Sequence, residues 1–229
     1  MGRVFGVSIG FIAVLAVIWF CSGNGIPKLH TMQETIVQTP TEPEATQTLA
    51  PVVGQGRYTF LVAKSIGAYE GQEGLSGVAA LELWNTGKSD IKYAEVLVEQ
   101  QERQLRFVVS YLPAGCGIIV PEKNNTPYTR DGITDFRCLT AMPLENGADK
   151  GSIAVIETSR YTLQITNLTS ETVGCVRIFY KPYNAGRAVF EGNVTYCVVI
   201  PDLAPGESRE IAPYLYASDE TKVVAVITE

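Results

Sequence analysis

The sequence contains a single histidine, His30, among 229 residues. Ser-His-Asp triads, Cys-His pairs, zinc sites with several histidines and His-ligated haem all need imidazole groups inside a folded domain. His30 lies in a polar segment that contains several prolines and has no core pattern. The sequence therefore excludes these kinds of site from the folded part of the chain.

Positive charge is also scarce. The 18 lysines and arginines are outnumbered by 24 aspartates and glutamates, which gives a net charge of −6. Proteins that bind nucleic acid use clustered lysine and arginine side chains to neutralise phosphates, and the sequence has no such cluster. It therefore argues against nucleic acid as a partner.

One long hydrophobic run lies at the N-terminus. Residues 4–20 contain no charged side chain, Arg3 precedes them, and Trp19 lies near their end. As a helix with about 1.5 Å rise per residue, this run measures roughly 25 Å, the short end of the range for crossing a bilayer. The arginine and the tryptophan favour an uncleaved single-pass anchor over residues 1–21, with a cytoplasmic N-terminus and the rest of the chain outside. The alternative is a cleaved signal peptide, which would make the protein secreted.

A polar segment, residues 22–55, follows the hydrophobic run. It contains four prolines among threonine, glutamine and glutamate, and its apolar residues are too scattered to form one face of a helix or strand. Such a composition cannot bury enough apolar surface to offset the entropy of ordering the chain. We therefore expect a disordered extracytoplasmic linker between the membrane and the folded part.

From Arg57 onward, apolar side chains recur at every second residue. Leu81 and Leu83 are one example, and Leu163 and Ile165 are another. This period is typical of strands, and no window of about a dozen residues has the apolar face of an amphipathic helix. The sequence predicts an all-β fold.

The folded part contains two copies of one pattern. Residues 81–96 align without gaps on residues 163–178 at an offset of 82, which places Asn85 on Asn167. Such self-similarity indicates repeated structural units, each with its own set of strands.

A second pair of segments extends the repeat. Residues 112–115 match residues 203–206 at an offset of 91, with the extra residues in the second copy's hairpin loop. We interpret the two copies as tandem antiparallel β-sandwich modules, residues 56–146 and 151–229. The resulting chain has an anchor, a linker and two modules.

The apolar pattern also suggests how one hairpin pairs in each module. Pairing residues whose numbers sum to 203 places Val96 opposite Phe107 in the first module. Pairing residues whose numbers sum to 372 places Ile178 opposite Val194 in the second. A slip of one residue would move every apolar side chain to the other face, so the pattern predicts these two registers.

The turns of this repeat resemble those of a known family. Leu203-Ala204-Pro205-Gly206-Glu207-Ser208 follows a strand, an Asn-containing turn and a second strand. This order is similar to the Ig-like modules of bacterial envelope proteins, of the CARDB and FxLYD kind. The resemblance covers most of residues 78–229 and rests on turn and core residues. It implies an Ig-like sandwich and an adhesive, spacer or partner-binding role, and it carries no site residue.

Two of the five cysteines fall in each module's range, Cys21 being the fifth. The second predicted register places Cys175 opposite Cys197, near enough for a cross-strand disulfide, with two packed thiols as the alternative. Cys116 and Cys138 form the other candidate pair, and its only support is that the first module contains an even number of cysteines. Neither pair has the C-x-x-C spacing of a redox or metal motif, and we expect no metal site and no cofactor.

Tyrosines are the best candidates for a binding surface, because they supply a large contact area at low entropic cost. Ordinary strand tyrosines are the alternative interpretation. Glu70 and Glu73 form one short acidic loop, which we interpret as solvated because it lacks the ligand count that calcium requires. The selected tyrosines are Tyr128, Tyr183, Tyr214 and Tyr216.

Together these features predict a membrane-anchored extracytoplasmic protein whose Ig-like modules bind an envelope protein or a surface polymer such as a glycan. One alternative is a structural spacer or scaffold subunit of a membrane complex. Another is an enzyme acting on envelope polysaccharide, since glycoside cleavage needs only two carboxylates. Binding is favoured over catalysis because sandwich modules of this size leave little room for a deep cleft.

Overall fold

The structure is a computed structural model that describes residues 47–53, 58–70, 74–100, 103–130, 132–144, 149 and 151–229. All the regular elements in these ranges are β-strands, so the all-β prediction is confirmed. Within the same ranges, no helix has the length and apolar character needed to cross a membrane. The predicted anchor at residues 4–20 lies outside the described residues.

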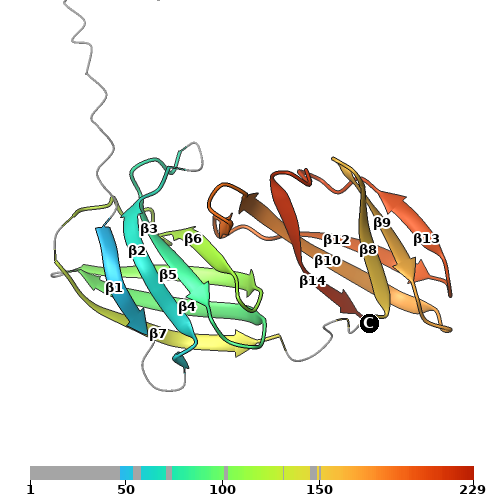
Figure 1. Ribbon diagram of the computed structural model, residues 1–229, viewed down its shortest axis with the longest axis horizontal. Helices are drawn as coiled ribbons and strands as arrows, with labels where there is room; N and C mark the ends of the chain where they lie inside the picture. The colour runs from blue at the N-terminus through green and yellow to red at the C-terminus, as the bar shows by residue number, and fades with distance from the viewer. Residues whose placement is uncertain are drawn as a thin grey trace, which may run out of the picture. The chain divides into compact units, whose positions relative to one another are not determined.

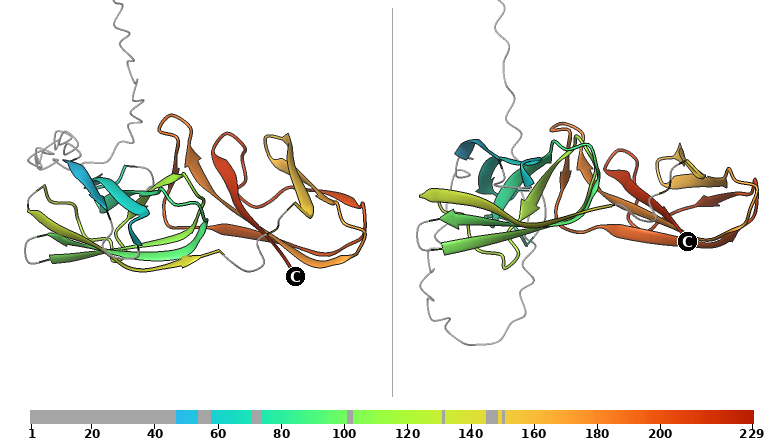
Figure 2. Two further views of the ribbon diagram at one scale, coloured as in Figure 1. Left: turned by 60° about the horizontal axis from the view of Figure 1, so that its bottom comes forward. Right: turned by 90° about the horizontal axis from the view of Figure 1, so that it is seen from below.

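The first repeat contains two sheets packed face to face (Figure 1). The two layers are seen edge-on, with cyan and green strands, in Figure 2. Buried side chains such as Leu81 from one sheet and Phe107 from the other share one core. One sheet has the order β1 (Gln47–Val53), β2 (Leu61–Ala68), β3 (Ala79–Asn85) and β6 (Gly117–Pro121), and the other β5 (Arg103–Leu112), β4 (Ile91–Gln100) and β7 (Ile133–Pro143).

The second repeat uses equivalent strands around its own core. Leu163 and Ile165 from one sheet pack with Ile178 and Ile200 from the other, as the alternation of apolar residues predicts. A short extra strand, β11 (Val189–Glu191), follows the end of β10. One sheet has the order β13 (Ser208–Ile211), β9 (Thr162–Asn167) and β8 (Ile153–Ser159), and in the other β10 (Val173–Asn184) pairs with both β12 (Tyr196–Leu203) and β14 (Thr221–Thr228).

Both repeats are built around a buried asparagine at the aligned position. Asn85 and Asn167 are both 0% exposed, and each donates through Nδ2 to one carbonyl in the turn after its own strand and to one at the later turn. These matching bonds confirm the offsets of 82 and 91 found in the sequence. The matching acceptors are the carbonyls of Ser89 and Leu112 for Asn85, and of Glu171 and Leu203 for Asn167, which also donates to the Ala204 carbonyl.

One of the two predicted registers is confirmed and the other is wrong. Val96 lies opposite Phe107, as predicted for the first hairpin. In the second, Ile178 lies opposite Val198 instead of Val194. The shift of four residues leaves every side chain on its predicted face, so the alternation of apolar residues could not distinguish the two registers.

The structure also differs from the predicted linker at its C-terminal end. Residues 47–53, assigned to the 22–55 linker, form β1 and pair antiparallel with β2. The pairing consists of backbone hydrogen bonds, which do not require an apolar face and so leave little trace in the composition. Residues 22–46 lie outside the described residues.

The two repeats are joined by strand pairing. The end of β10 turns at residues 185–188 into β11, which pairs in parallel with β6 of the first repeat. A continuous sheet, β1-β2-β3-β6-β11-β10-β12, therefore runs through both repeats. The pairing also covers the edge of β6, which would otherwise present unpaired backbone groups.

Candidate functional site

A polar groove lies where the β10–β11 hairpin meets the loop after β2. Its volume is about 290 Å³. Tyr69 and Glu70 line it from the first repeat, and Arg187 and Glu191 line it from the second, with Ile119 of β6 between them. We call this set the junction groove. Because its walls come from both repeats, neither repeat could form it alone.

Strand pairing at the junction positions the walls of this groove. Glu191 lies opposite Ile119 in the parallel β11–β6 pair, and the backbone N–H of Gly192 donates to the Ile119 carbonyl at 2.9 Å. Gly117 allows the Trp84 ring to lie directly on β6, since a Cβ atom at Gly117 would be 2.5 Å from that ring. A side chain at this position would push the ring away from the strand.

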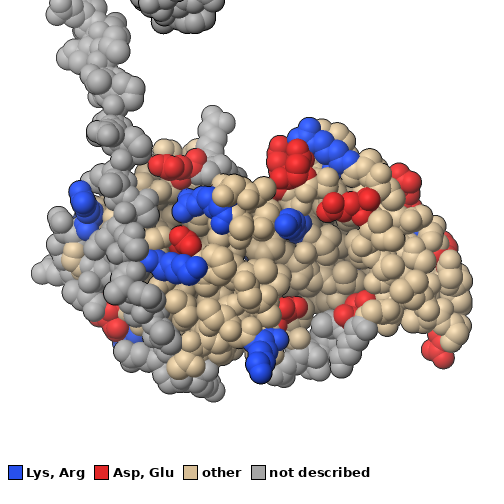
Figure 3. Space-filling model, viewed as in Figure 1, with Lys and Arg blue, Asp and Glu red and all other residues tan. Residues whose placement is uncertain are grey.

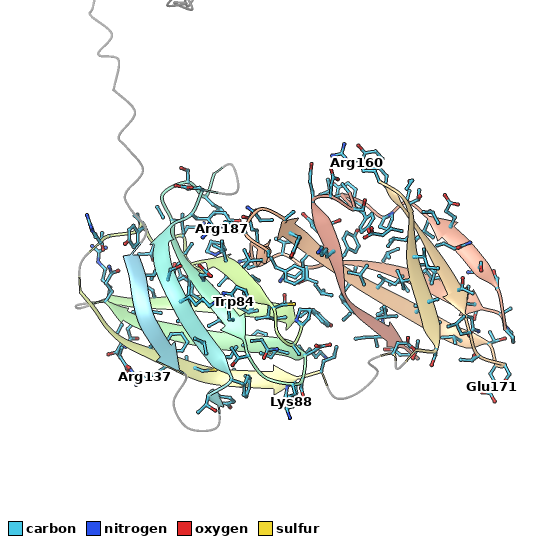
Figure 4. All side chains as sticks on the ribbon, viewed as in Figure 1. Trp84, Lys88, Arg137, Arg160, Glu171 and Arg187 are labelled. Atoms are coloured by element: carbon cyan, nitrogen blue, oxygen red, sulfur yellow. The ribbon has the colours of Figure 1, made fainter. Side chains whose placement is uncertain are left out.

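Glu82 supplies a fixed negative charge beside the groove. Its two carboxylate oxygens accept hydrogen bonds from Trp84 Nε1 at 2.8 Å and from Ser65 Oγ at 2.9 Å. Arg187 Nη2 lies 3.8 Å from the same carboxylate. Figure 4 labels Arg187 and Trp84, which come from different repeats. Because neutral donors hold the Glu82 carboxylate in place, the Arg187 guanidinium remains able to pair with a ligand.

Asn184 organises the part of the groove that comes from the second repeat. Its side-chain carbonyl accepts from the Arg187 backbone N–H at 3.0 Å, and its Nδ2 donates to Glu191 at 2.8 Å. The side chain of Arg187 is 53% exposed. Asparagine and glycine, as in Asn184-Ala185-Gly186, are typical turn residues, but the sequence does not reveal that this turn reaches the first repeat.

The hydroxyl of Tyr69 contributes a neutral donor. Tyr69 is buried, and its pKa is raised above its usual value, first by burial and then by the charge of Glu191. The groove therefore combines donors, acceptors and both signs of charge. Figure 3 shows acidic and basic side chains interspersed over one face of the molecule.

The groove suits recognition of a polar ligand better than group transfer. Among the lining residues that the structure describes, two carboxylates and one arginine occur without a cysteine, serine or histidine. In the described part of the chain, no three acidic, cysteine or histidine side chains come together as a metal site would require. The arrangement can bind a polar or charged group through opposite charges and hydrogen bonds.

A buried lysine lies at the contact between the repeats. Lys181 is 0% exposed, and its Nζ donates to the Ser110 carbonyl of the first repeat at 2.8 Å. Burial lowers its pKa to about 8. Next to it, the rings of Tyr111 and Phe179 stack at 4.2 Å between centroids. These contacts hold the repeats together beside the β11–β6 pair.

A second hollow lies in the first repeat alone and is mainly apolar. It has a volume of about 260 Å³ and is lined by Phe60, Ile91 and Pro143, with Lys88 and Ser89 among its polar residues. We call it the apolar pocket. The equivalent place in the second repeat, about 330 Å³, is lined largely by polar residues from 169 to 172, with Val173 and the end of β14. The two repeats therefore differ at this site.

The four selected tyrosines do not form one surface. Tyr128 and Tyr216 are buried, and Tyr216 donates to Glu157 at 2.8 Å. Tyr183 is half-buried against Phe190. Only Tyr214 is largely exposed, at 77%. Strand and turn positions alone could not separate these cases, because burial of each ring depends on loops from elsewhere in the chain.

The structure contains neither predicted disulfide, since Cys116, Cys138, Cys175 and Cys197 are free thiols. With the observed register, Cys197 lies opposite Phe179, four residues from Cys175. Because a strand rises about 3.3 Å per residue, an offset of four residues places the two Cα atoms farther apart than the limit of about 7 Å for a disulfide. Cys138 is half-buried, and burial raises the pKa of its thiol to about 11.

The acidic loop of the first repeat is only partly described. Glu70 is exposed, which agrees with the interpretation as a solvated loop, and it also lines the junction groove. Glu73 and the join between the modules near residues 145–147 lie outside the described residues, as does His30.

Comparison of the chain with known protein families, with curated proteins and with solved structures finds no match.

Proposed function

We propose that the chain is a membrane-anchored extracytoplasmic protein with Ig-like modules that binds an envelope protein or a surface polymer through the junction groove. The observation that carries the proposal is the composition of the groove, which joins Arg187 and Glu191 of one repeat to Glu70 of the other. Charged and hydrogen-bonding side chains around this hollow suit a polar chain laid across it.

The exposed guanidinium of Arg187 is the main recognition group in this proposal. An arginine can make two parallel hydrogen bonds to a carboxylate or phosphate, whereas Glu70 and Glu191 attract cationic groups. A ligand with both signs of charge would fit this arrangement. Peptides and amino-sugar polymers with acidic substituents both have that chemistry.

A structural spacer is the second candidate function. It is favoured by the contacts that join the repeats, namely the β11–β6 pair and the bond from Lys181 to the Ser110 carbonyl. A spacer requires such a junction but does not require charged residues around a groove. The two functions therefore differ in what a substitution at Arg187 should do.

The first test compares binding by the wild-type protein and Arg187→Gln. The full chain, solubilised in detergent, is used as bait for membrane extracts and for isolated surface polysaccharide. We expect Arg187→Gln to lower recovery of the bound partner roughly tenfold, because removing a central charge pair costs more than about 1.4 kcal/mol. Recovery is measured by mass spectrometry or by sugar analysis.

Arg137→Gln is the matched control for this experiment. Arg137 is also an exposed, ion-paired arginine, but it lies on β7 and pairs with Asp135. Its substitution should leave binding unchanged. If neither protein nor polysaccharide is retained above background by the wild type, the binding proposal fails and the spacer function is the better explanation.

A further inference from the structure

The loop between β13 and β14 contains a strained turn. The N–H of Tyr216 donates to the Pro213 carbonyl at 3.2 Å, so residues 213–216 form a β-turn with Leu215 at its third position. The φ angle of Leu215 is +56°. A turn with positive φ only at this position is of type II, and glycine normally occupies the position because it has no Cβ. Leu215 therefore has a backbone conformation that normally favours glycine, although its own side chain is bulky.

This turn presents two apolar side chains to solvent. Tyr214 is 77% exposed and Leu215 is 57% exposed. The turn is nevertheless fixed from beneath, because the buried Tyr180 hydroxyl donates to the Tyr214 carbonyl and Pro213 is buried. The exposed Leu215 side chain has no role in the core, yet the turn retains its backbone strain. This combination points to a contact that the Leu215 side chain makes with another surface.

The apolar pocket of the first repeat has the properties of a receptor for such a side chain. Its volume of about 260 Å³ is below the range of about 300–1,000 Å³ that is usual for small-molecule sites. Phe60, Ile91 and Pro143 give it an apolar lining. It is therefore better suited to one or two protruding side chains than to a cofactor.

A cation at the pocket is able to pair with the acidic side chains next to the turn. Asp219 and Glu220 share a single partner, Arg160, at 2.9 and 3.1 Å, which leaves a net negative charge beside the turn. At the pocket, Lys88 is exposed and has no ion pair with any described residue, so its ammonium group is available to an acidic partner such as Asp219 or Glu220. Asp90, an acidic residue that also lines the pocket, accepts from the Ala114 N–H at 2.8 Å. Figure 4 labels Arg160 and Lys88, which extend from different repeats.

We propose that the turn at residues 213–216 of one copy inserts Leu215 into the apolar pocket of a second copy of the chain. The two surfaces differ, so the contact is head-to-tail and leaves a turn and a pocket unused at the ends of each complex. Contacts of this kind build open rows of molecules when they do not close into rings. The proposal does not depend on the junction groove.

Two variants test the two surfaces separately. Leu215→Gly removes the protruding side chain and relieves the left-handed strain. Ser89→Arg places a long side chain at the pocket, where Ser89 is an exposed lining residue. Leu168→Gly is the matched control, because Leu168 is 62% exposed and lies in another turn of the second repeat.

The measurement is the mass of the full chain in detergent micelles, determined by light scattering over a series of concentrations. The wild type and Leu168→Gly should grow in mass as concentration rises. Leu215→Gly and Ser89→Arg should weaken this association by about tenfold to a hundredfold, the effect of losing one buried leucine. The thermal unfolding midpoint of Leu215→Gly should equal or exceed that of the wild type, because glycine adopts the required φ without strain.

Mixing the two variants tests the head-to-tail arrangement. Leu215→Gly retains a working pocket and Ser89→Arg retains a working turn, so an equal mixture should form complexes of two copies and no larger ones. The proposal is overturned if the wild type stays a single copy at every concentration or if Leu215→Gly associates as the wild type does. It is also overturned if the mixture stays at one copy while the wild type associates.

Discussion

Lys181 illustrates how a single residue can lower stability while joining two parts of a molecule. Its ammonium group is fully buried, and its only described hydrogen bond goes to the Ser110 carbonyl. Burial disfavours the charged form, which is why its pKa falls from 10.5 to about 8. The difference corresponds to about 3 kcal/mol of unfavourable free energy when the lysine is charged.

This cost predicts a stability that increases with pH. Below pH 8 the lysine is protonated in both the folded and the unfolded chain, so the full cost is present. Between about pH 8 and pH 10.5 the unfolded chain binds the proton that the folded chain has released, and the free energy of unfolding should therefore rise. Chemical denaturation at a series of pH values measures this rise.

Substitution by methionine isolates the contribution of Lys181. Lys181→Met keeps a long side chain without charge, and it should raise the free energy of unfolding at pH 7 by about 1–3 kcal/mol. It should also flatten the rise above pH 8. Lys222→Met, at the exposed residue opposite Lys181 on β14, is the control and should preserve the rise. An equal rise in Lys181→Met would show that other groups cause it.

At the scale of elements, β11 belongs to the second repeat by sequence but contributes to the core of the first. Phe190, at its centre, is 3% exposed and packs with the first repeat's cluster, opposite Ile118 of β6. The strand is only three residues long. Its pairing with β6 therefore depends on this side chain more than on its few backbone hydrogen bonds.

Phe190→Ala should therefore loosen the junction as well as lower stability. We expect a loss of about 3 kcal/mol in the free energy of unfolding, the usual cost of truncating a buried phenylalanine. Hydrogen exchange at Gly192, whose N–H bonds to the Ile119 carbonyl, should become faster. Val199→Ala, at an exposed position of β12, should change neither quantity. Unchanged exchange at Gly192 in Phe190→Ala would contradict a role for Phe190 in docking β11.

The elements also differ in how well the sequence predicts them. The first hairpin pairs as its apolar pattern indicates, because its turn lies directly between the two paired segments. The second hairpin is interrupted by β11, and its strands pair four residues away from the predicted register. Alternation identifies which face a side chain takes but cannot distinguish registers that differ by an even number of residues.

At the scale of the whole molecule, the continuous sheet should make the two repeats unfold together. Each repeat has its own core, yet strands of both repeats hydrogen-bond in one sheet. Loss of either core would expose surface that the other repeat covers. Unfolding of one repeat is therefore expected to destabilise its neighbour.

Alanine substitution of the two buried asparagines tests this coupling. Asn85→Ala removes two hydrogen bonds to backbone carbonyls and Asn167→Ala removes three, so each should cost about 2–4 kcal/mol. Calorimetry should show one transition in the wild type, and each variant should lower the midpoint of that same transition. Two separate transitions, each sensitive to one asparagine only, would show that the junction does not couple the repeats.

The sequence by itself determined the β-strand character of the two repeats, the apolar faces of their cores and the equivalence of Asn85 and Asn167, but not the strands β1 and β11. These features depend on local periodicity and on turn residues, and both are properties of residues that lie close together in the sequence. Only the tertiary structure decided the β11–β6 pairing, the burial of Lys181, the exposure of Tyr214 and the meeting of Arg187 with Glu82. Pairing between distant strands is made by backbone groups that are the same in almost every residue, so side-chain patterns alone could not reveal it.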